Sequence, residues 1–192
     1  YDPDGGSFTG WEPEGGYARI HHVAAPVSEG VLLAGGGLRQ DGVLSVTPGE
    51  APQIYDVDNK ELVAIEGVSS RAYGVGVGLP NGKVLLYGGV SSSMGAVSPQ
   101  LYNPATGVVT ESLGTGKCDD CFGMVATVLG SHEVILSGGL EDDGLGGYEP
   151  SQAVSEFDYT DPVEKLGTQT SLGHARAFHA AALLEGDRVL MV

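Results

Sequence analysis

Basic residues are scarce in this chain. Its 192 residues include 9 Lys and Arg against 25 Asp and Glu, which gives a formal net charge of −16. A surface this acidic repels phosphate groups, so binding to nucleic acid or anionic lipid is disfavoured. Long apolar runs are also missing, and none approaches the roughly 20 residues of a membrane-spanning helix. The sequence therefore predicts neither a nucleic-acid partner nor insertion into a membrane.

Common catalytic signatures are absent as well. The chain has no Gly-x-Ser-x-Gly elbow, no His-Glu-x-x-His motif, no phosphate loop and no dinucleotide fingerprint. No nucleophile stands out with a matched base. The sequence therefore favours a non-catalytic protein, and no cofactor is predicted beyond a calcium candidate described below.

Cysteine is limited to Cys118 and Cys121, in the sequence Cys-Asp-Asp-Cys. This spacing favours a short disulfide in an oxidising compartment. Half of a zinc site, a redox site and two free thiols are the alternatives. The disulfide, together with the acidic charge, predicts an extracellular, cell-surface or periplasmic location.

Glycine, by contrast, is abundant, at 32 residues, while hydrophobic residues make up 41% and recur in short blocks. Many glycines between many short apolar runs are typical of an all-β protein with tight turns. No helical periodicity interrupts this pattern.

A repeat of about 50 residues organises the chain. Apolar runs end in glycine pairs that lie 53 and 50 residues apart (35 to 88, 88 to 138). The pairs are Gly35-Gly36, Gly88-Gly89 and Gly138-Gly139. A residue without Cβ lets two backbones approach closely and permits positive φ, so we expect these glycines to be structural.

Each repeat contains segments for about four strands. A tyrosine-led strand follows each variable loop, around Tyr55, Tyr102 and, with phenylalanine instead, Phe157. A fourth strand follows, predicted in the third repeat at residues 163–166. Asn81-Gly82, and Glu29-Gly30 in the first repeat, predict two-residue hairpin turns between the first two strands. Four antiparallel strands per repeat are typical of propeller blades.

The glycine pairs, the tyrosine strand starts and this period resemble the kelch-repeat β-propeller family, in the style of secreted or surface bacterial proteins. The family's aromatic residue near the last strand is replaced by Leu62 and Val109. More distantly, the chain is similar to the propeller of galactose oxidase-like proteins. The resemblance implies an all-β kelch-type β-propeller of four-stranded antiparallel blades.

The resemblance divides the chain at the repeat boundaries. The end of one blade occupies residues 1–18, and the start of another occupies 176–192. Complete blades occupy 19–70, 71–119 and 120–175. Kelch-like rings usually hold six or seven blades, which need roughly 300–350 residues, so we expect this chain to be part of a larger ring. A four-bladed ring closed by the two halves is the alternative.

Two kinds of side chain recur at repeat positions and are candidates for binding. Arg19, Arg71 and Arg176 could hold a carboxylate or an anionic sugar, or could pair with groups of the next blade. His22 and His179 also match, with Gly74 and Gly123 expected in the other repeats. These histidines could bind a metal or could bond to neighbouring backbone.

Other candidates lie near loops. Trp11 and Tyr148 could stack on a sugar or anchor a partner, or could pack in the core. Acidic residues beside glycines could bind calcium or could form turns. These acidic candidates are Asp2, Asp4, Asp142 and Asp143.

The predicted function is recognition of a protein or glycan through the loops at residues 38–52, 91–99 and 141–152, because a rigid ring holds such loops together. One alternative is a fragment of a galactose oxidase-like copper enzyme, whose metal site the resemblance implies needs two tyrosines, two histidines and a cysteine. Another is a structural segment of an extracellular homo- or hetero-assembly.

Overall fold

The computed structural model describes residue 5 and residues 19–36, 38–40, 43–45, 51–93, 95–114, 116, 118 and 120–192. Every helix or strand assigned within these residues is a β-strand, which confirms the predicted all-β class. No helix in this part of the chain is long and apolar enough to cross a membrane. Trp11, Asp2 and Asp4 lie outside the described residues.

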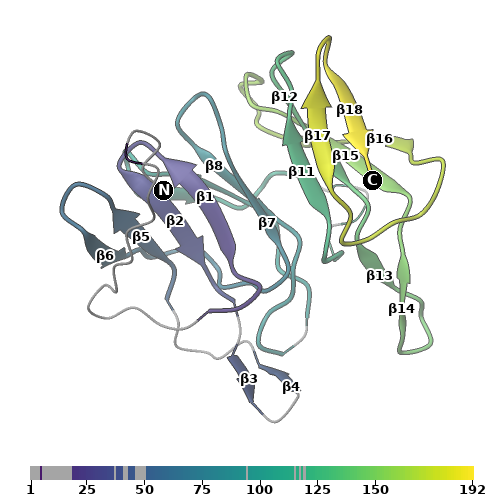
Figure 1. Ribbon diagram of the computed structural model, residues 1–192, viewed down its shortest axis with the longest axis horizontal. Helices are drawn as coiled ribbons and strands as arrows, with labels where there is room; N and C mark the ends of the chain where they lie inside the picture. The colour runs from purple at the N-terminus through teal and green to yellow at the C-terminus, as the bar shows by residue number, and fades with distance from the viewer. Residues whose placement is uncertain are drawn as a thin grey trace.

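Three four-stranded antiparallel sheets follow one another along the chain, and a two-stranded hairpin comes after the third (Figure 1). Two further two-stranded hairpins are inserted within the first and third sheets. The first sheet has the order β1-β2-β5-β6. Its strands are β1 (Val23–Val27), β2 (Gly30–Ala34), β5 (Gln53–Asp56) and β6 (Glu61–Ala64). The hairpin of β3 (Leu38–Gln40) and β4 (Val43–Ser45) is inserted after β2.

The next two sheets repeat this plan. The strands of the second are β7 (Val75–Gly78), β8 (Val84–Tyr87), β9 (Gln100–Asn103) and β10 (Val108–Thr110). Those of the third are β11 (Val125–Val128), β12 (Glu133–Ser137), β15 (Ala153–Asp158) and β16 (Leu166–Ser171). The third carries an inserted hairpin of β13 (Leu140–Asp142) and β14 (Tyr148–Pro150), and the chain continues into β17 (Ala181–Leu184) and β18 (Arg188–Met191).

Two local predictions need correction. The fourth strand of the third sheet begins at Leu166, whereas residues 163–166 were predicted, because the Asp161 carboxylate accepts the Val163 amide at 2.8 Å and holds a turn there. The predicted two-residue turn at Asn81-Gly82 is instead a connection of three residues between Leu79 and Lys83. Gly82 has a φ of 83° there, and its amide donates to the Leu79 carbonyl. In the first repeat the two turn residues are 28 and 29, so Gly30 already pairs with Val27.

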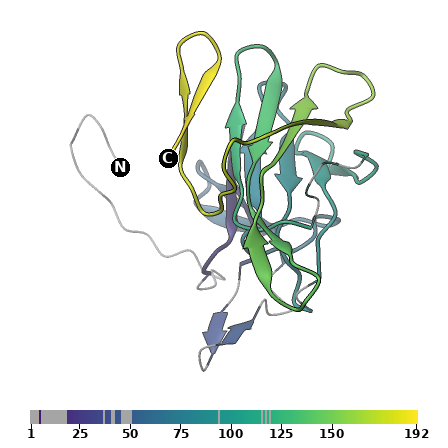
Figure 2. The same cartoon turned by 90° about the vertical axis from the view of Figure 1, so that its right-hand side faces the viewer.

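The first strands of successive sheets lie side by side in chain order: β1 contacts β7, β7 contacts β11, and β11 contacts β17 (Figures 1 and 2). Strand β8 is buried on both faces because it sits between two core clusters. Its Val84 and Leu86 face the first sheet, and its Leu85 and Tyr87 face the third. The apolar run before the second glycine pair therefore packs against both neighbouring sheets.

The glycine pairs make the same contact at each junction between repeats. The second glycine donates its amide to a carbonyl of the next repeat, each at 2.9 Å: Gly36 to Arg71, Gly89 to Cys121 and Gly139 to Arg176. The first glycine has positive φ, and a Cβ there would meet the same backbone. At Gly88 that Cβ would lie 2.6 Å from the Cys121 oxygen. At Gly35 and Gly138 it would overlap the backbone of Arg71 and Arg176.

A second backbone contact runs beside the first. The amide of Tyr73 bonds the carbonyl of His21 at 2.9 Å, Gly123 bonds Tyr73 at 2.9 Å, and Phe178 bonds Gly123 at 2.7 Å. All four residues have a left-handed backbone, with φ between 52° and 69°. Each junction is therefore fixed by two main-chain hydrogen bonds at the start of the first strand.

The tyrosine-led strands contribute their rings to the sheets unequally. Tyr102 on β9 is buried in the cluster between the first and second sheets, and burial together with the charge of Glu29 raises its pKa. Tyr55 on β5 is half-buried and pairs with Leu62 of β6.

Candidate functional site

The repeated arginines hold their own repeats together. The Arg71 side chain is fully buried and donates to the carbonyls of Gly88 and Ser98, each at 3.1 Å, and to the Gln100 side chain at 3.0 Å. Burial lowers its pKa to about 10, so it remains charged at neutral pH. The expectation that Arg71 binds a ligand, or pairs with the next blade, is corrected: its partners lie within its own repeat.

Arg19 makes the equivalent contacts in the first repeat. It donates to the Gly35 carbonyl at 2.7 Å and to the Gln53 side chain at 2.8 Å. Arg176 is half-buried, and its Nε donates to the His174 carbonyl at 3.4 Å. The acceptors of these hydrogen bonds are backbone carbonyl oxygens and side-chain amide oxygens.

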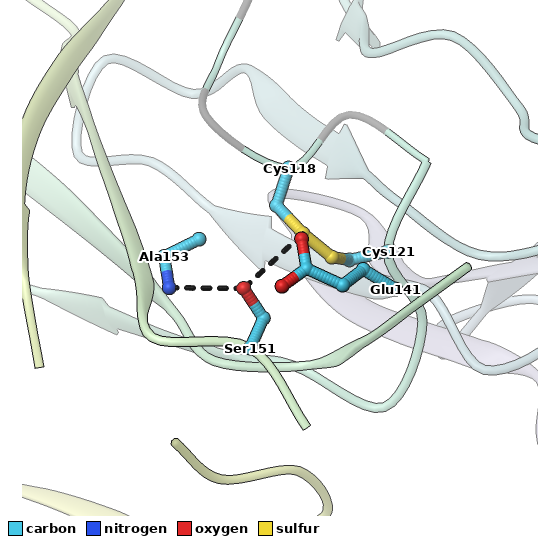
Figure 3. The surroundings of a disulfide bond; sticks show 5 residues. All are labelled: Cys118, Cys121, Glu141, Ser151 and Ala153. Carbon is cyan, nitrogen blue, oxygen red and sulfur yellow. Dashed lines mark hydrogen bonds between the residues drawn. A yellow bond between two sulfur atoms is a disulfide. The ribbon is translucent and has the colours of Figure 1, made fainter. Parts of the chain in front are cut away.

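In the third repeat a disulfide takes the place of this arginine. Cys121 stands where Arg71 stands in the second repeat, and Ser155 stands where Gln100 does. Cys121 and Cys118 form the predicted disulfide, with their Cα atoms 5.2 Å apart (Figure 3). Both cysteines are buried in the cluster between the second and third sheets. The third repeat therefore has a disulfide and a serine at the positions where the second repeat has an arginine and a glutamine.

The histidine positions also need a correction. His22, Gly74 and His179 each lie three positions after a repeated arginine. In the third repeat, where Cys121 replaces the arginine, the equivalent residue is Met124 and not the predicted Gly123. Gly123 belongs to the preceding, left-handed position, which it shares with His21, Tyr73 and Phe178. Its lack of a side chain has a local reason, because a Cβ at Gly123 would lie 2.6 Å from the Phe178 ring.

An open pocket of about 300 Å³ lies where the first strands of the repeats begin. His22 and His179 both line it, beside the rings of the left-handed residues. The Nε2 of His179 lies 3.1 Å from the Ser137 hydroxyl, while its Nδ1 is buried without a hydrogen-bond partner. Burial, followed by the charge of Arg176, lowers the pKa of His179, which keeps its imidazole neutral near neutral pH.

Aromatic rings form a continuous cluster that starts in this pocket, with His21, Tyr73 and Phe178, and extends beyond it. His21 stacks on Tyr73 with ring centroids 4.1 Å apart, and Tyr73 meets Phe178 edge-on at 5.9 Å. Phe122 lies 5.9 Å from Tyr73 and meets Tyr148 edge-on at 4.9 Å. Phe178 and Tyr148 remain 60% and 49% exposed, so part of the cluster is open to a ligand.

The described parts of the predicted contact loops lie at the same end as the pocket, while residues 41–42, 46–50 and 94 of these loops lie outside the described residues. The pocket lies at the beginning of the first strands, and the loops follow the ends of the second strands. Because the first and second strands of each sheet are antiparallel, the beginning of one and the end of the other lie at the same end of the sheet. Figure 1 shows the β3–β4 and β13–β14 hairpins projecting on this side. Tyr148 of β14 connects the third loop to the aromatic cluster.

The acidic candidates in the β13–β14 turn are occupied by backbone. Asp142 accepts the Gly144 amide at 2.7 Å. Asp143 accepts the amides of Leu145 at 2.7 Å and Gly147 at 2.9 Å, and these bonds lower its pKa. Both carboxylates act as turn formers, which is the alternative that the sequence left open.

Among the described residues, one group of three potential metal ligands occurs: Cys118, Cys121 and Glu141. It contains no histidine, and none of its three residues lines the pocket. No protein-family model matches this chain. No curated protein matches it either.

Two aromatic residues of the cluster were missed in the sequence. Tyr73 lies two positions after Arg71, and Phe122 lies one position after Cys121. The signal that could have found Tyr73 is the recurrence of a ring two residues after the arginine, at His21, Tyr73 and Phe178.

Proposed function

We propose that this chain is part of a kelch-type β-propeller that recognises a glycan through the aromatic pocket on its loop face. The repeat resemblance supports the propeller, as do the four-stranded sheets and the adjacent first strands. The net charge of −16 disfavours nucleic acid as the ligand.

The observation that carries the binding proposal is the left-handed ring position. Glycine adopts positive φ without strain, whereas a bulky L-residue there costs of order 1–3 kcal/mol. Three of the four equivalent positions nevertheless hold rings, at His21, Tyr73 and Phe178. Backbone strain of this kind clusters at binding and active sites, because the strained residue aims a side chain that function needs.

The chemistry of the pocket suits a sugar ring. Exposed aromatic faces stack on the C–H face of a pyranose, and neighbouring imidazoles can donate to or accept from its hydroxyls. Phe178 offers exposed aromatic surface and lines the pocket with His22 and His179, and Tyr148 adds an exposed ring at the far end of the aromatic cluster. A volume of about 300 Å³ lies at the small end of ligand sites, so we expect one or two sugar units to be held.

The test replaces Phe178 by glycine, the residue that the third repeat uses at this position. Glycan binding should fall about fivefold or more, because loss of one stacked ring removes roughly 1–3 kcal/mol by analogy with base stacking. The free energy of unfolding should stay the same or rise by about 1 kcal/mol, because the left-handed strain is released. Saturation-transfer NMR against a glycan panel, followed by calorimetry, measures binding, and chemical denaturation measures stability.

Leu145→Gly is the matched control. Leu145 is 92% exposed at the tip of the β13–β14 hairpin, on the same face but outside the pocket. This variant should bind glycan like the wild type. The proposal fails if no glycan in the panel binds the wild type, or if Phe178→Gly binds as tightly as Leu145→Gly.

The copper alternative receives no support from the cysteines. The resemblance to galactose oxidase-like proteins implies a tyrosine linked to a cysteine beside the metal. Both cysteines of this chain are joined to each other. We propose an extracellular, cell-surface or periplasmic location, because disulfides persist in oxidising compartments.

A further inference from the structure

The Cys118–Cys121 disulfide lies against a carboxylate. Cys118 and Cys121 are 3% and 0% exposed, and Glu141 of β13 is half-buried beside them (Figure 3). The two sulfur atoms and a Glu141 oxygen all lie within 4.8 Å of one another. An antiparallel bridge between Phe122 and Leu140 fixes this arrangement, since it holds the residue after Cys121 to the residue before Glu141.

The oxidised state does not explain why these groups lie together. A disulfide sulfur carries no hydrogen, so it has nothing to donate to Glu141, whose Oε2 lies 3.9 Å from the Cys118 sulfur. Ser151 is buried, its Oγ lies 3.7 Å from the same sulfur, and that oxygen already accepts the Ala153 amide at 3.0 Å. The Ser151 hydroxyl hydrogen is therefore available to the sulfur, and it would bond a thiolate far better than a disulfide.

We propose that the reduced chain binds one thiophilic divalent cation of the Zn²⁺ class through the thiolates of Cys118 and Cys121 and the carboxylate of Glu141. Water completes the coordination. Reduction converts the disulfide to two thiols. A dithiol supplies the two electrons and two protons and becomes a disulfide itself, whereas a phosphine supplies the two electrons and becomes its oxide, with water providing the two protons and the oxygen. The cation then displaces both thiol protons, so oxidation in turn releases the metal.

The geometry suits such a cation. Bonds of about 2.3 Å to sulfur and about 2.1 Å to oxygen put tetrahedral ligands roughly 3.6 Å apart. The Cys118 sulfur and the Glu141 oxygen are already separated by 3.9 Å. Two residues between the cysteines is a usual spacing for zinc ligands, and only the sulfur atoms must move apart when the disulfide opens.

The surroundings favour the bound state in two ways. A hydroxyl bonded to a metal-bound thiolate fixes the ligand's orientation, which is the role that the geometry gives Ser151. The net charge of −16 raises the local concentration of cations around the protein. The site is separate from the glycan pocket, so its test does not depend on the proposed function.

The experiment titrates Zn²⁺ into metal-free chain reduced with a phosphine under anaerobic conditions, in competition with a chromophoric chelator. We expect one Zn²⁺ per chain, and Co²⁺ in its place should give thiolate-to-cobalt charge-transfer absorption. The Cys118→Ser/Cys121→Ser variant should lose this binding. Glu141→Gln should weaken Zn²⁺ affinity at least tenfold while the absorption from the two thiolates persists.

Glu149→Gln is the matched control, since Glu149 faces Glu141 across the β13–β14 hairpin and carries the same charge. It should bind Zn²⁺ like the wild type. As an independent readout, Zn²⁺ should slow oxidation of the reduced wild type by oxidised glutathione, and less so for Glu141→Gln. The proposal is overturned if the reduced wild type binds no more Zn²⁺ than the double serine variant, or if Glu141→Gln and Glu149→Gln bind equally.

Discussion

At the residue scale, the first glycine of each pair meets two constraints at once, a left-handed backbone and a close approach to the next repeat. Gly88 has a φ of 61° and no room for a Cβ beside the Cys121 carbonyl. Gly107 has a φ of 70° in the turn before β10, with nothing within 4 Å of a Cβ. The two positions therefore share the backbone requirement and differ in the close approach.

We predict that Gly88→Ala destabilises the chain more than Gly107→Ala. The left-handed backbone should cost about 1–2 kcal/mol in both variants. The close approach should add about 1–3 kcal/mol at Gly88 alone, as overpacking does. Chemical denaturation of the two variants measures the difference. Equal losses would show that conformation, and not contact between repeats, requires glycine at the junction.

His179 makes stability depend on pH. Its pKa in the folded chain lies below its ordinary value of about 6.5, so below that pH the unfolded chain binds more protons than the folded one. The wild type should therefore lose stability as pH falls from 7 to 5. His179→Gln should lose less over this range, as measured by denaturation at each pH. His174→Gln, which removes an exposed imidazole, is the control, and a His179→Gln profile parallel to wild type would contradict the prediction.

At the scale of elements, the sequence predicts most of the strands correctly, because glycine pairs and apolar runs recur with one period. It predicts the ends of the strands less well. Asp161 moves the start of β16 to Leu166 by capping a turn, which composition alone does not reveal. Gly82 adopts positive φ and Asn81 does not, since three residues lie between Leu79 and Lys83, whose backbones are hydrogen-bonded to each other.

The candidate site is also predicted only in part. The sequence identifies the residues that recur at repeat positions, but their roles depend on burial, which the sequence does not show. Arg71 is predicted as readily as Arg19, yet only the structure shows that its guanidinium is enclosed and bonded to its own repeat. Phe122 and Glu141 come together with their partners through the bridge between Phe122 and Leu140, a contact between segments that no local pattern encodes.

At the scale of the whole molecule, the junctions between repeats should differ in stability. The first two junctions join complete four-stranded sheets, whereas the third joins a sheet to the two-stranded β17–β18 hairpin. Local opening is easier where fewer strands support a hydrogen bond.

Hydrogen exchange should reveal this gradient. We predict that the amides of Gly36, Tyr73, Gly89 and Gly123 exchange at least tenfold more slowly than the amide of Gly107 in its exposed turn. The amides of Gly139 and Phe178, at the third junction, should exchange at intermediate rates. Exchange at the first two junctions as fast as at Gly107 would show that the sheets are not held together by these bonds.

The junction bonds join main-chain atoms on both sides, and apart from glycine they make no demand on side-chain identity. Arginine, cysteine and arginine supply the accepting carbonyl at the three successive junctions, and the hydrogen-bond length is the same at each. A unit could thus be duplicated, deleted or exchanged without redesigning its neighbours. Such a chain can change its number of units, and diverge widely in sequence, while each new copy docks in the same orientation.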